Sequence, residues 1–216
     1  MWRKLVNLIL GPLIALAVVV GFPGPASAAL RIIAFGDSLT AGFGLPIEQS
    51  FPVRLQAWLA AHGIDAEVVN AGVSGDTTAG GLERLDWALS GGADAVLVEL
   101  GANDALRGLD PKAAYDNLDA ILTRLGADKA KVLLLGMEAP ANWGPDYRKQ
   151  FDAIYPTLAQ AHHAMLYPFF LDGVALDPAL NQPDGLHPNA QGVEVIVGRI
   201  GPYVLRLIGL AAAGSG

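Results

Sequence analysis

Short apolar runs alternate with longer amphipathic stretches along most of the chain. Phe51, Leu55, Trp58 and Leu59 repeat at the spacing of one helical face and predict a helix that ends at Gly63. Similar signals predict further helices over residues 77–89, from 110 onward, around 151–158 with a bend at Pro156, and from about 189. The apolar runs expected to form strands are 31–35, 66–69, 95–100, 131–135 and 166–169.

Strands that alternate with helices indicate right-handed βαβ units and a parallel sheet covered on both faces. Five strands predict a flavodoxin-like α/β fold, a three-layer α/β/α sandwich. No internal repeat or long linker interrupts the alternation, so we expect one domain over residues 29–210 and a flexible tail over 211–216. In such sheets ligands bind beyond the carboxyl ends of the strands.

The first 28 residues have the layout of a secretory signal peptide. Arg3 and Lys4 precede an apolar run, and a small-residue run over 26–29 predicts cleavage after Ala28. The alternative is an uncleaved membrane anchor, for which the apolar run is marginal in length and is interrupted by polar and helix-breaking residues. We therefore expect an exported protein, periplasmic or secreted, with no stable membrane insertion after cleavage.

Composition narrows the range of functions. The 216 residues are 52% hydrophobic and 16% charged, which is typical of a folded chain rather than a disordered one. The net charge of −7 becomes −9 once the only two charges of the leader, Arg3 and Lys4, are removed, so we expect no nucleic-acid partner. The chain has no cysteine, which excludes disulfides, thiolate catalysis and cysteine-bound metals.

Polar residues gather in the loops that follow the predicted strands. Ser38 lies in the Gly-rich segment 36–42, where free backbone N–H groups at a helix start suit a nucleophile whose attack creates an oxyanion. Taken alone, this serine is explained better as a helix cap. Gly72 can supply a backbone N–H, and Asn103 a side-chain amide, to the same oxyanion. Each also fits an ordinary turn.

Asp184 and His187 stand three residues apart, just before the last predicted helix. This spacing lets a carboxylate hold an imidazole in one tautomer and leaves the other nitrogen to act as a base, with a surface turn as the alternative. With Ser38 they follow the order Ser, Asp, His that some hydrolases use. His162 and His163 are adjacent and face different sides of a helix, so we expect no metal site there.

Four blocks in order carry a resemblance to a known family: Gly36-Asp37-Ser38-Leu39, Asn70-Ala71-Gly72, Gly101-Ala102-Asn103-Asp104 and Asp184-Gly185-Leu186-His187-Pro188. Over about residues 30–208 the chain resembles the SGNH (GDSL) hydrolases, within them the bacterial thioesterase I / protease I / lysophospholipase L1 and arylesterase group. The resemblance implies a catalytic triad and an oxyanion hole without cofactor or metal. The triad would be Ser38, Asp184 and His187, and the oxyanion hole Ser38, Gly72 and Asn103.

Two further segments resemble loops that border the acyl pocket in the thioesterase-like members. They imply Leu106, Arg107 and Pro140 as substrate contacts. Ala105 stands where a glycine is usual in that group, and Glu138 where a more basic residue is common. Neither departure touches the triad, but both weaken any transfer of acyl-chain preference.

The sequence therefore predicts a serine esterase that hydrolyses carboxylic esters or thioesters of small to medium acyl groups through an acyl-enzyme. Its partner would be a small-molecule ester, and a monomer is the expectation for so small a hydrolase. Two alternatives stay open. One is a carbohydrate O-acetylesterase of the same fold, and the other is a non-catalytic flavodoxin-like binding module.

Overall fold

A computed structural model describes residues 29–213. The predicted signal peptide and its cleavage site at Ala28 lie outside the described residues. One sheet of five parallel strands forms the centre, in the order β2-β1-β3-β4-β5. The strands are β1 (Leu30–Gly36), β2 (Ala66–Gly72), β3 (Ala95–Glu99), β4 (Lys131–Leu135) and β5 (Met165–Tyr167).

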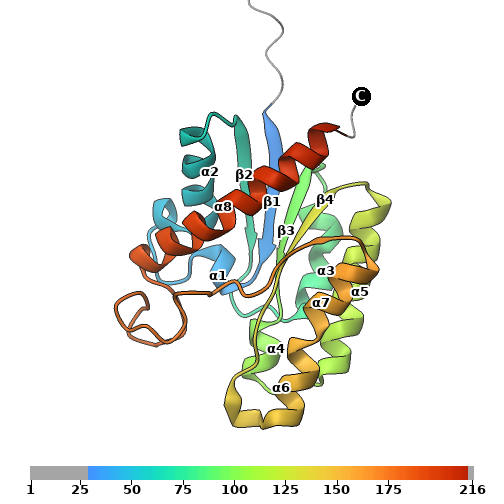
Figure 1. Cartoon of the computed structure of the whole chain (residues 1–216), viewed down its shortest axis with the longest axis vertical. Helices are drawn as coiled ribbons and strands as arrows, with labels where there is room; N and C mark the ends of the chain where they lie inside the picture. Colours follow the sequence, from blue (N-terminus) through green and yellow to red (C-terminus); the bar gives the residue numbers. More distant parts are fainter. Residues whose placement is uncertain (1–28, 214–216) are drawn as a thin grey trace, which may run out of the picture.

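Helices cover both faces of this sheet, as Figure 1 shows. Helices α2 and α8 pack on one face, whereas α3, α5 and α7 pack on the other. The helices are α1 (Ser38–Ala41), α2 (Phe51–Ala61), α3 (Thr78–Ala88), α4 (Ala102–Leu106), α5 (Pro111–Ala127), α6 (Pro145–Asp152), α7 (Ile154–Ala161) and α8 (Ala190–Ala213), with the 3-10 turns η1 (Ile47–Gln49) and η2 (Ala141–Trp143). The predicted three-layer sandwich is confirmed.

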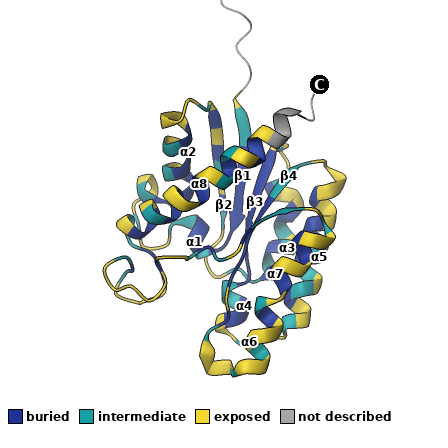
Figure 2. Ribbon diagram, viewed as in Figure 1, coloured by how far each residue is buried: buried dark blue, intermediate teal, exposed yellow. Residues whose placement is uncertain are grey.

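The central strands are apolar because both of their faces are covered. Ile32, Ile33 and Phe35 of β1 have no exposed surface, and all five residues of β3 are buried. Figure 2 shows this buried layer between half-exposed helices. Helix α5 begins at Pro111 after the cap Asp110, whose side chain accepts a hydrogen bond from a backbone N–H.

Strand register brings three loops together at one edge of the sheet. Gly36, the last residue of β1, pairs with Gly72 on one side and with Glu99 on the other. The loops that leave β1, β2 and β3 therefore start side by side.

None of the helices in residues 29–213 combines the length and the apolar character needed to cross a membrane.

Two sequence predictions about helices are corrected. The helix expected around 151–158 does not bend at Pro156, because α6 and α7 are separate helices that meet at Ala153. Pro156 lies in the first turn of α7, where its missing N–H costs no intrahelical hydrogen bond. Helix α8 also runs on to Ala213, three residues into the segment expected as a flexible tail.

Candidate active site

Ser38 is the first residue of the one-turn helix α1. The turn is held on both sides: the Asp37 side chain accepts a hydrogen bond from the Leu39 N–H, and Gly42 closes the turn in a left-handed conformation. The Ser38 side chain is half-buried, and its hydroxyl lines a pocket. The β1–α1 turn therefore presents a serine at the edge of the sheet where ligands of such folds bind.

His187 and Asp184 come to this serine from the loop before α8. The His187 Nε2 lies 2.9 Å from Ser38 Oγ, and its Nδ1 lies 2.6 Å from Asp184 Oδ2. The ring of Phe43 packs against the imidazole, with ring centroids 4.6 Å apart. The three residues that the sequence singled out as a triad are thus joined by one chain of hydrogen bonds.

The Asp184 carboxylate fixes the state of the histidine. Hydrogen bonds from the His187 side chain and from the backbone N–H groups of His187 and Leu186 lower the pKa of Asp184 to about 2. An ionised carboxylate can only accept hydrogen bonds, so Nδ1 of a neutral His187 carries the proton. The lone pair on Nε2 therefore faces the Ser38 hydroxyl and can take its proton.

The surroundings of Gly72 do not favour its predicted role as an oxyanion donor. Its N–H already donates to Asn70 Oδ1 at 3.0 Å, and Gly72 lies at the end of β2, packed against the backbone of Ala41 and outside the pocket lining. Gly75, three residues on, lines the pocket beside Ser38 with φ +88°. Among the described residues, neither the Gly75 N–H nor the Ser38 N–H donates a hydrogen bond. These two N–H groups therefore belong to residues that line the pocket and have no hydrogen-bond acceptor among the described residues.

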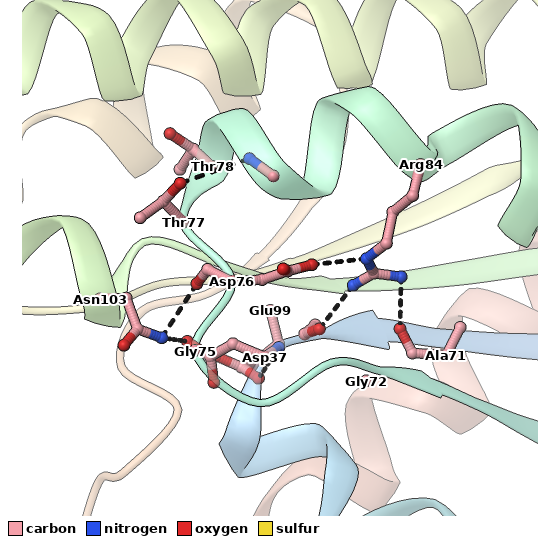
Figure 3. Close-up of polar contacts among 12 residues, drawn as sticks. Asp37, Ala71, Gly72, Gly75, Asp76, Thr77, Thr78, Arg84, Glu99 and Asn103 are labelled. Carbon is pink, nitrogen blue, oxygen red and sulfur yellow. Dashed lines mark hydrogen bonds and ion pairs between the residues drawn. The ribbon is translucent and has the colours of Figure 1, made fainter.

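Asn103, which the sequence singled out as an oxyanion donor, lies in the first turn of α4 and lines the same pocket. Its Nδ2 donates to Asp37 Oδ2 at 3.0 Å and to the backbone oxygen of Asp76 at 2.9 Å (Figure 3). Both amide hydrogens are therefore engaged in the free site. An oxyanion would have to draw one of them away, or share it, to gain Asn103 as a third donor.

Two arginines hold the loop that carries Gly75. Arg84 of α3 donates to the Asp76 carboxylate, to Ala71 O and to Gly36 O at 2.5, 2.8 and 2.8 Å, so it ties this loop to the ends of β1 and β2 (Figure 3). Arg107 donates to Gly75 O at 2.9 Å. Arg107 is not among the residues that line the pocket, and its hydrogen bond supports the loop, so its role as a substrate contact stays a prediction.

The pocket beside Ser38 has a volume of about 680 Å³. Leu106 and Pro140, two of the three predicted substrate contacts, line it. Most other lining side chains are apolar, among them Leu39, Phe43, Met137, Phe169, Leu171 and Leu176. In residues 29–213, no group of three or more His, Cys, Asp or Glu side chains is arranged to hold a metal ion.

Comparisons with known proteins place the chain among ester-hydrolysing enzymes. The model of the GDSL-like lipase/acylhydrolase family matches residues 34–195. The chain is 42% identical over 162 residues to an arylesterase of Vibrio mimicus, covering 74% of this chain and 81% of that protein. It is 42% identical over 166 residues to thioesterase 1/protease 1/lysophospholipase L1 of Escherichia coli (strain K12), covering 76% and 78%. The solved structure of AlinE4, an SGNH-hydrolase family esterase, is similar with a TM-score of 0.72 and 48% identity, covering 83% of this chain and 97% of that one.

Proposed function

Because the chain belongs to the GDSL-like lipase/acylhydrolase family and is thus an ester-hydrolysing enzyme, we propose that it cleaves carboxylic esters and thioesters of small to medium acyl groups. The observation that carries the proposal is the hydrogen-bond chain from Ser38 through His187 to Asp184 at the wall of an apolar pocket. Ser38 is the nucleophile, His187 the general base and Asp184 the group that orients it.

Acylation begins when His187 Nε2 takes the hydroxyl proton as Ser38 Oγ attacks the acyl carbonyl carbon. The carbonyl oxygen becomes an oxyanion that faces the free N–H groups of Ser38 and Gly75, and it competes for one hydrogen of the Asn103 amide. Each such donor is worth about 3 kcal/mol in the transition state. The protonated imidazole is held by the Asp184 carboxylate.

Collapse of the tetrahedral intermediate breaks the bond to the leaving oxygen or sulfur, which takes the proton from His187. The acyl group stays on Ser38 as an ester. Water then enters beside His187, loses a proton to Nε2 and attacks the acyl-enzyme, and the same donors face the second oxyanion. Release of the carboxylic acid returns Ser38 and His187 to their starting protonation states.

The pocket supports an acyl group of moderate size. Its volume of about 680 Å³ and its apolar lining suit a hydrocarbon chain, because apolar surface gains from leaving water. Arg148 also lines the pocket and pairs with Glu138 at 3.1 Å, so its charge is neutralised by the protein.

We place the enzyme outside the cytoplasm on the layout of residues 1–28 alone.

The test is a series of p-nitrophenyl esters of increasing acyl length, run beside a long-chain acyl-CoA, with wild type and Ser38→Ala. We expect hydrolysis by the wild type with an optimum at short to medium chains. Ser38→Ala should lose turnover but keep the circular dichroism spectrum and melting temperature of the wild type. Ester hydrolysis by Ser38→Ala at the wild-type rate would overturn the proposal.

A further inference from the structure

Glu99, the last residue of β3, is a fully buried carboxyl group directly behind the turn that carries Ser38. Its two oxygens have different surroundings. Oε2 accepts three hydrogen bonds, from Asp37 N at 3.2 Å, from Thr40 N at 3.2 Å and from Thr40 Oγ1 at 2.8 Å. Oε1 is buried and accepts none from the described residues. A neutral carboxylic acid has this asymmetry, with one oxygen that accepts and one O–H that donates.

Asp37 is the second member of the pair and is also fully buried. Its Oδ1 accepts from Leu39 N and its Oδ2 from the Asn103 amide, as expected of an ionised carboxylate. The two carboxyl groups are neighbours, and a hydrogen bond from the Glu99 side chain favours the ionised form of Asp37. Glu99 Oε1 therefore has an acceptor available if it carries a proton.

No cation compensates this pair. In the described part of the chain, neither carboxyl group forms an ion pair with a lysine or arginine. Arg84 is engaged with Asp76 and with backbone oxygens. Two uncompensated negative charges in one buried cluster are strongly unfavourable. Burial accordingly raises the pKa of Asp37 to about 6, and burial together with the Asp37 charge raises that of Glu99 well above its usual value.

The remaining titratable groups around the pair come from two other elements. His187, on the loop before α8, lies on the Asp37 side and weakly favours its ionised form. Tyr155 of α7 donates its hydroxyl to Leu100 O, and burial holds its pKa well above the usual value, so it stays neutral. Neither group contacts Glu99 Oε1, which leaves the Asp37 carboxylate as the partner for a proton there.

Gly36 leaves space for the Glu99 carboxyl group and the Thr40 hydroxyl, because it has no side chain. A Cβ on Gly36 would lie 2.5 Å from Glu99 Oε2 and 2.2 Å from Thr40 Oγ1. Both distances are well inside van der Waals contact, so any larger residue at position 36 would displace the buried acid. The cluster therefore depends on a glycine at the start of the nucleophile turn.

We propose that Glu99 is a neutral acid that donates its Oε1–H to the Asp37 carboxylate, and that this shared proton positions the Ser38 turn and the Asn103 amide for acyl transfer. The inference rests on the proposed function. Glu99 and Asp37 are positioning residues, because they act through their hydrogen bonds to α1 and to Asn103.

The shared proton has an electrostatic consequence at the oxyanion hole. With it, the cluster carries one negative charge instead of two, and this charge lies directly behind the Asn103 amide. A second charge there would oppose the developing oxyanion and would hold the Asn103 hydrogen more tightly to Asp37. The proton on Glu99 thus weakens the competition for the hydrogen that the oxyanion needs.

A direct test reads the proton itself. The infrared spectrum of the wild-type chain at neutral pH is compared with that of Glu99→Gln. The difference between the two spectra should contain the carbonyl stretch of a protonated carboxylic acid that is present in the wild type and absent from Glu99→Gln. Absence of this band from the wild-type spectrum, or its persistence in Glu99→Gln, would overturn the inference. The infrared band does not depend on catalysis. Its absence would therefore contradict the proton on Glu99 without contradicting the proposed esterase activity, which Ser38→Ala tests.

Kinetics then test the positioning role. Glu99→Gln keeps one accepting oxygen and gains an N–H₂ that can donate to Asp37, so kcat should stay within about threefold of wild type. Glu99→Leu removes both functions and should lower kcat about 10-fold to 100-fold with little change in KM. Glu99→Leu should also cost less in an Asn103→Ala background than in the wild type, because both changes act on the same donor.

A matched control separates positioning from loss of stability. Leu118 is fully buried in α5 and does not line the pocket, so Leu118→Ala should lower the melting temperature without lowering kcat. If Glu99→Leu keeps wild-type kcat, or if Glu99→Gln is as slow as Glu99→Leu, the positioning role is wrong. If Leu118→Ala lowers kcat as much as Glu99→Leu does, lost stability explains the effect and the positioning role is likewise wrong.

Discussion

We expect Arg84→Met to disturb both the stability and the catalytic rate without touching a residue of the triad. Arg84 donates to the Asp76 carboxylate and to the two backbone oxygens at the ends of β1 and β2, and its guanidinium lies 4.4 Å above the Phe35 ring. Methionine can keep much of the apolar contact with Phe35, but it donates no hydrogen bond. The Asp76 charge and two backbone oxygens would lose their partner.

The cost follows from the burial of this pair. The Arg84 and Asp76 side chains are only 16% and 17% exposed, so water can replace the lost partner only in part. Breaking a fully buried ion pair from one side costs about 3–5 kcal/mol, and exposed pairs contribute at most about 1 kcal/mol. We therefore expect Arg84→Met to lower the free energy of unfolding by about 3 kcal/mol. For a domain of this size that is about 6–12 °C in melting temperature.

The same change should slow catalysis, because Arg84 ties down the loop that presents the Gly75 N–H and the Asp76 oxygen. We expect kcat for a p-nitrophenyl ester to fall about tenfold or more. Arg84→Lys keeps the positive charge but cannot form the same three hydrogen bonds, so its kcat and stability should lie between those of wild type and Arg84→Met. The control is Arg124→Met, which removes an arginine that is 44% exposed and pairs with Asp86 and Asp128. It should cost less than about 1 kcal/mol.

Urea unfolding followed by circular dichroism gives the free energies, and initial rates of ester hydrolysis give kcat for the same preparations. The expectation for Arg84 is that stability and kcat fall together, whereas Arg124→Met changes neither. An Arg84→Met protein within about 1 kcal/mol of wild type and with wild-type kcat would refute the reasoning.

Two further predictions concern Gly75 and Asp184. Gly75→Ala has room for its Cβ but strains the backbone at φ +88° by about 1 kcal/mol, so kcat should fall about 10-fold to 100-fold with a small loss of stability. Gly72→Ala should instead lose more stability and less kcat, because its Cβ would meet Ala41 N at 2.3 Å. Equal kcat losses in both variants would contradict Gly75, rather than Gly72, as the oxyanion donor. The pKa of Asp184 lies at about 2, below its ordinary value of 3.8. The contribution of Asp184 to stability is therefore complete above pH 3.8 and is lost as the pH falls through about 2. Asp184→Asn should remove this acid dependence in urea titrations and lower kcat about 10³-fold to 10⁴-fold; an unchanged kcat would exclude Asp184 from the triad.

The sequence was sufficient to predict the architecture and to single out the candidate reacting groups. Five short apolar runs that alternate with helical periods are sufficient to predict a parallel sheet, because helices that connect successive parallel strands cover both faces of the sheet. Since the carboxyl ends of such strands share one edge, Ser38, Asn103 and His187 could be expected together from their places after separate strands or before the last helix. The structure brings these three side chains to one pocket.

The neighbours that support these groups could be identified only once the chain was folded. Gly72 ends β2 and Gly75 lies in the loop that follows, and the choice between them depends on which N–H is already bonded, which the sequence does not state. Arg84 resembles any surface arginine on a helix until α3 packs over the ends of β1 and β2. Glu99 ends a run that otherwise predicts a plain buried strand.

The physical reason for this division is the range of each interaction. Hydrophobic periodicity and turn chemistry act between residues close in the chain, so they can be identified in the sequence and they determine the elements and the loops. The direction of a free N–H, the proton on Glu99 and the ion pair of Arg84 depend on groups from different loops and strands. Their energies are set by burial and by contacts that exist only once the sheet has formed.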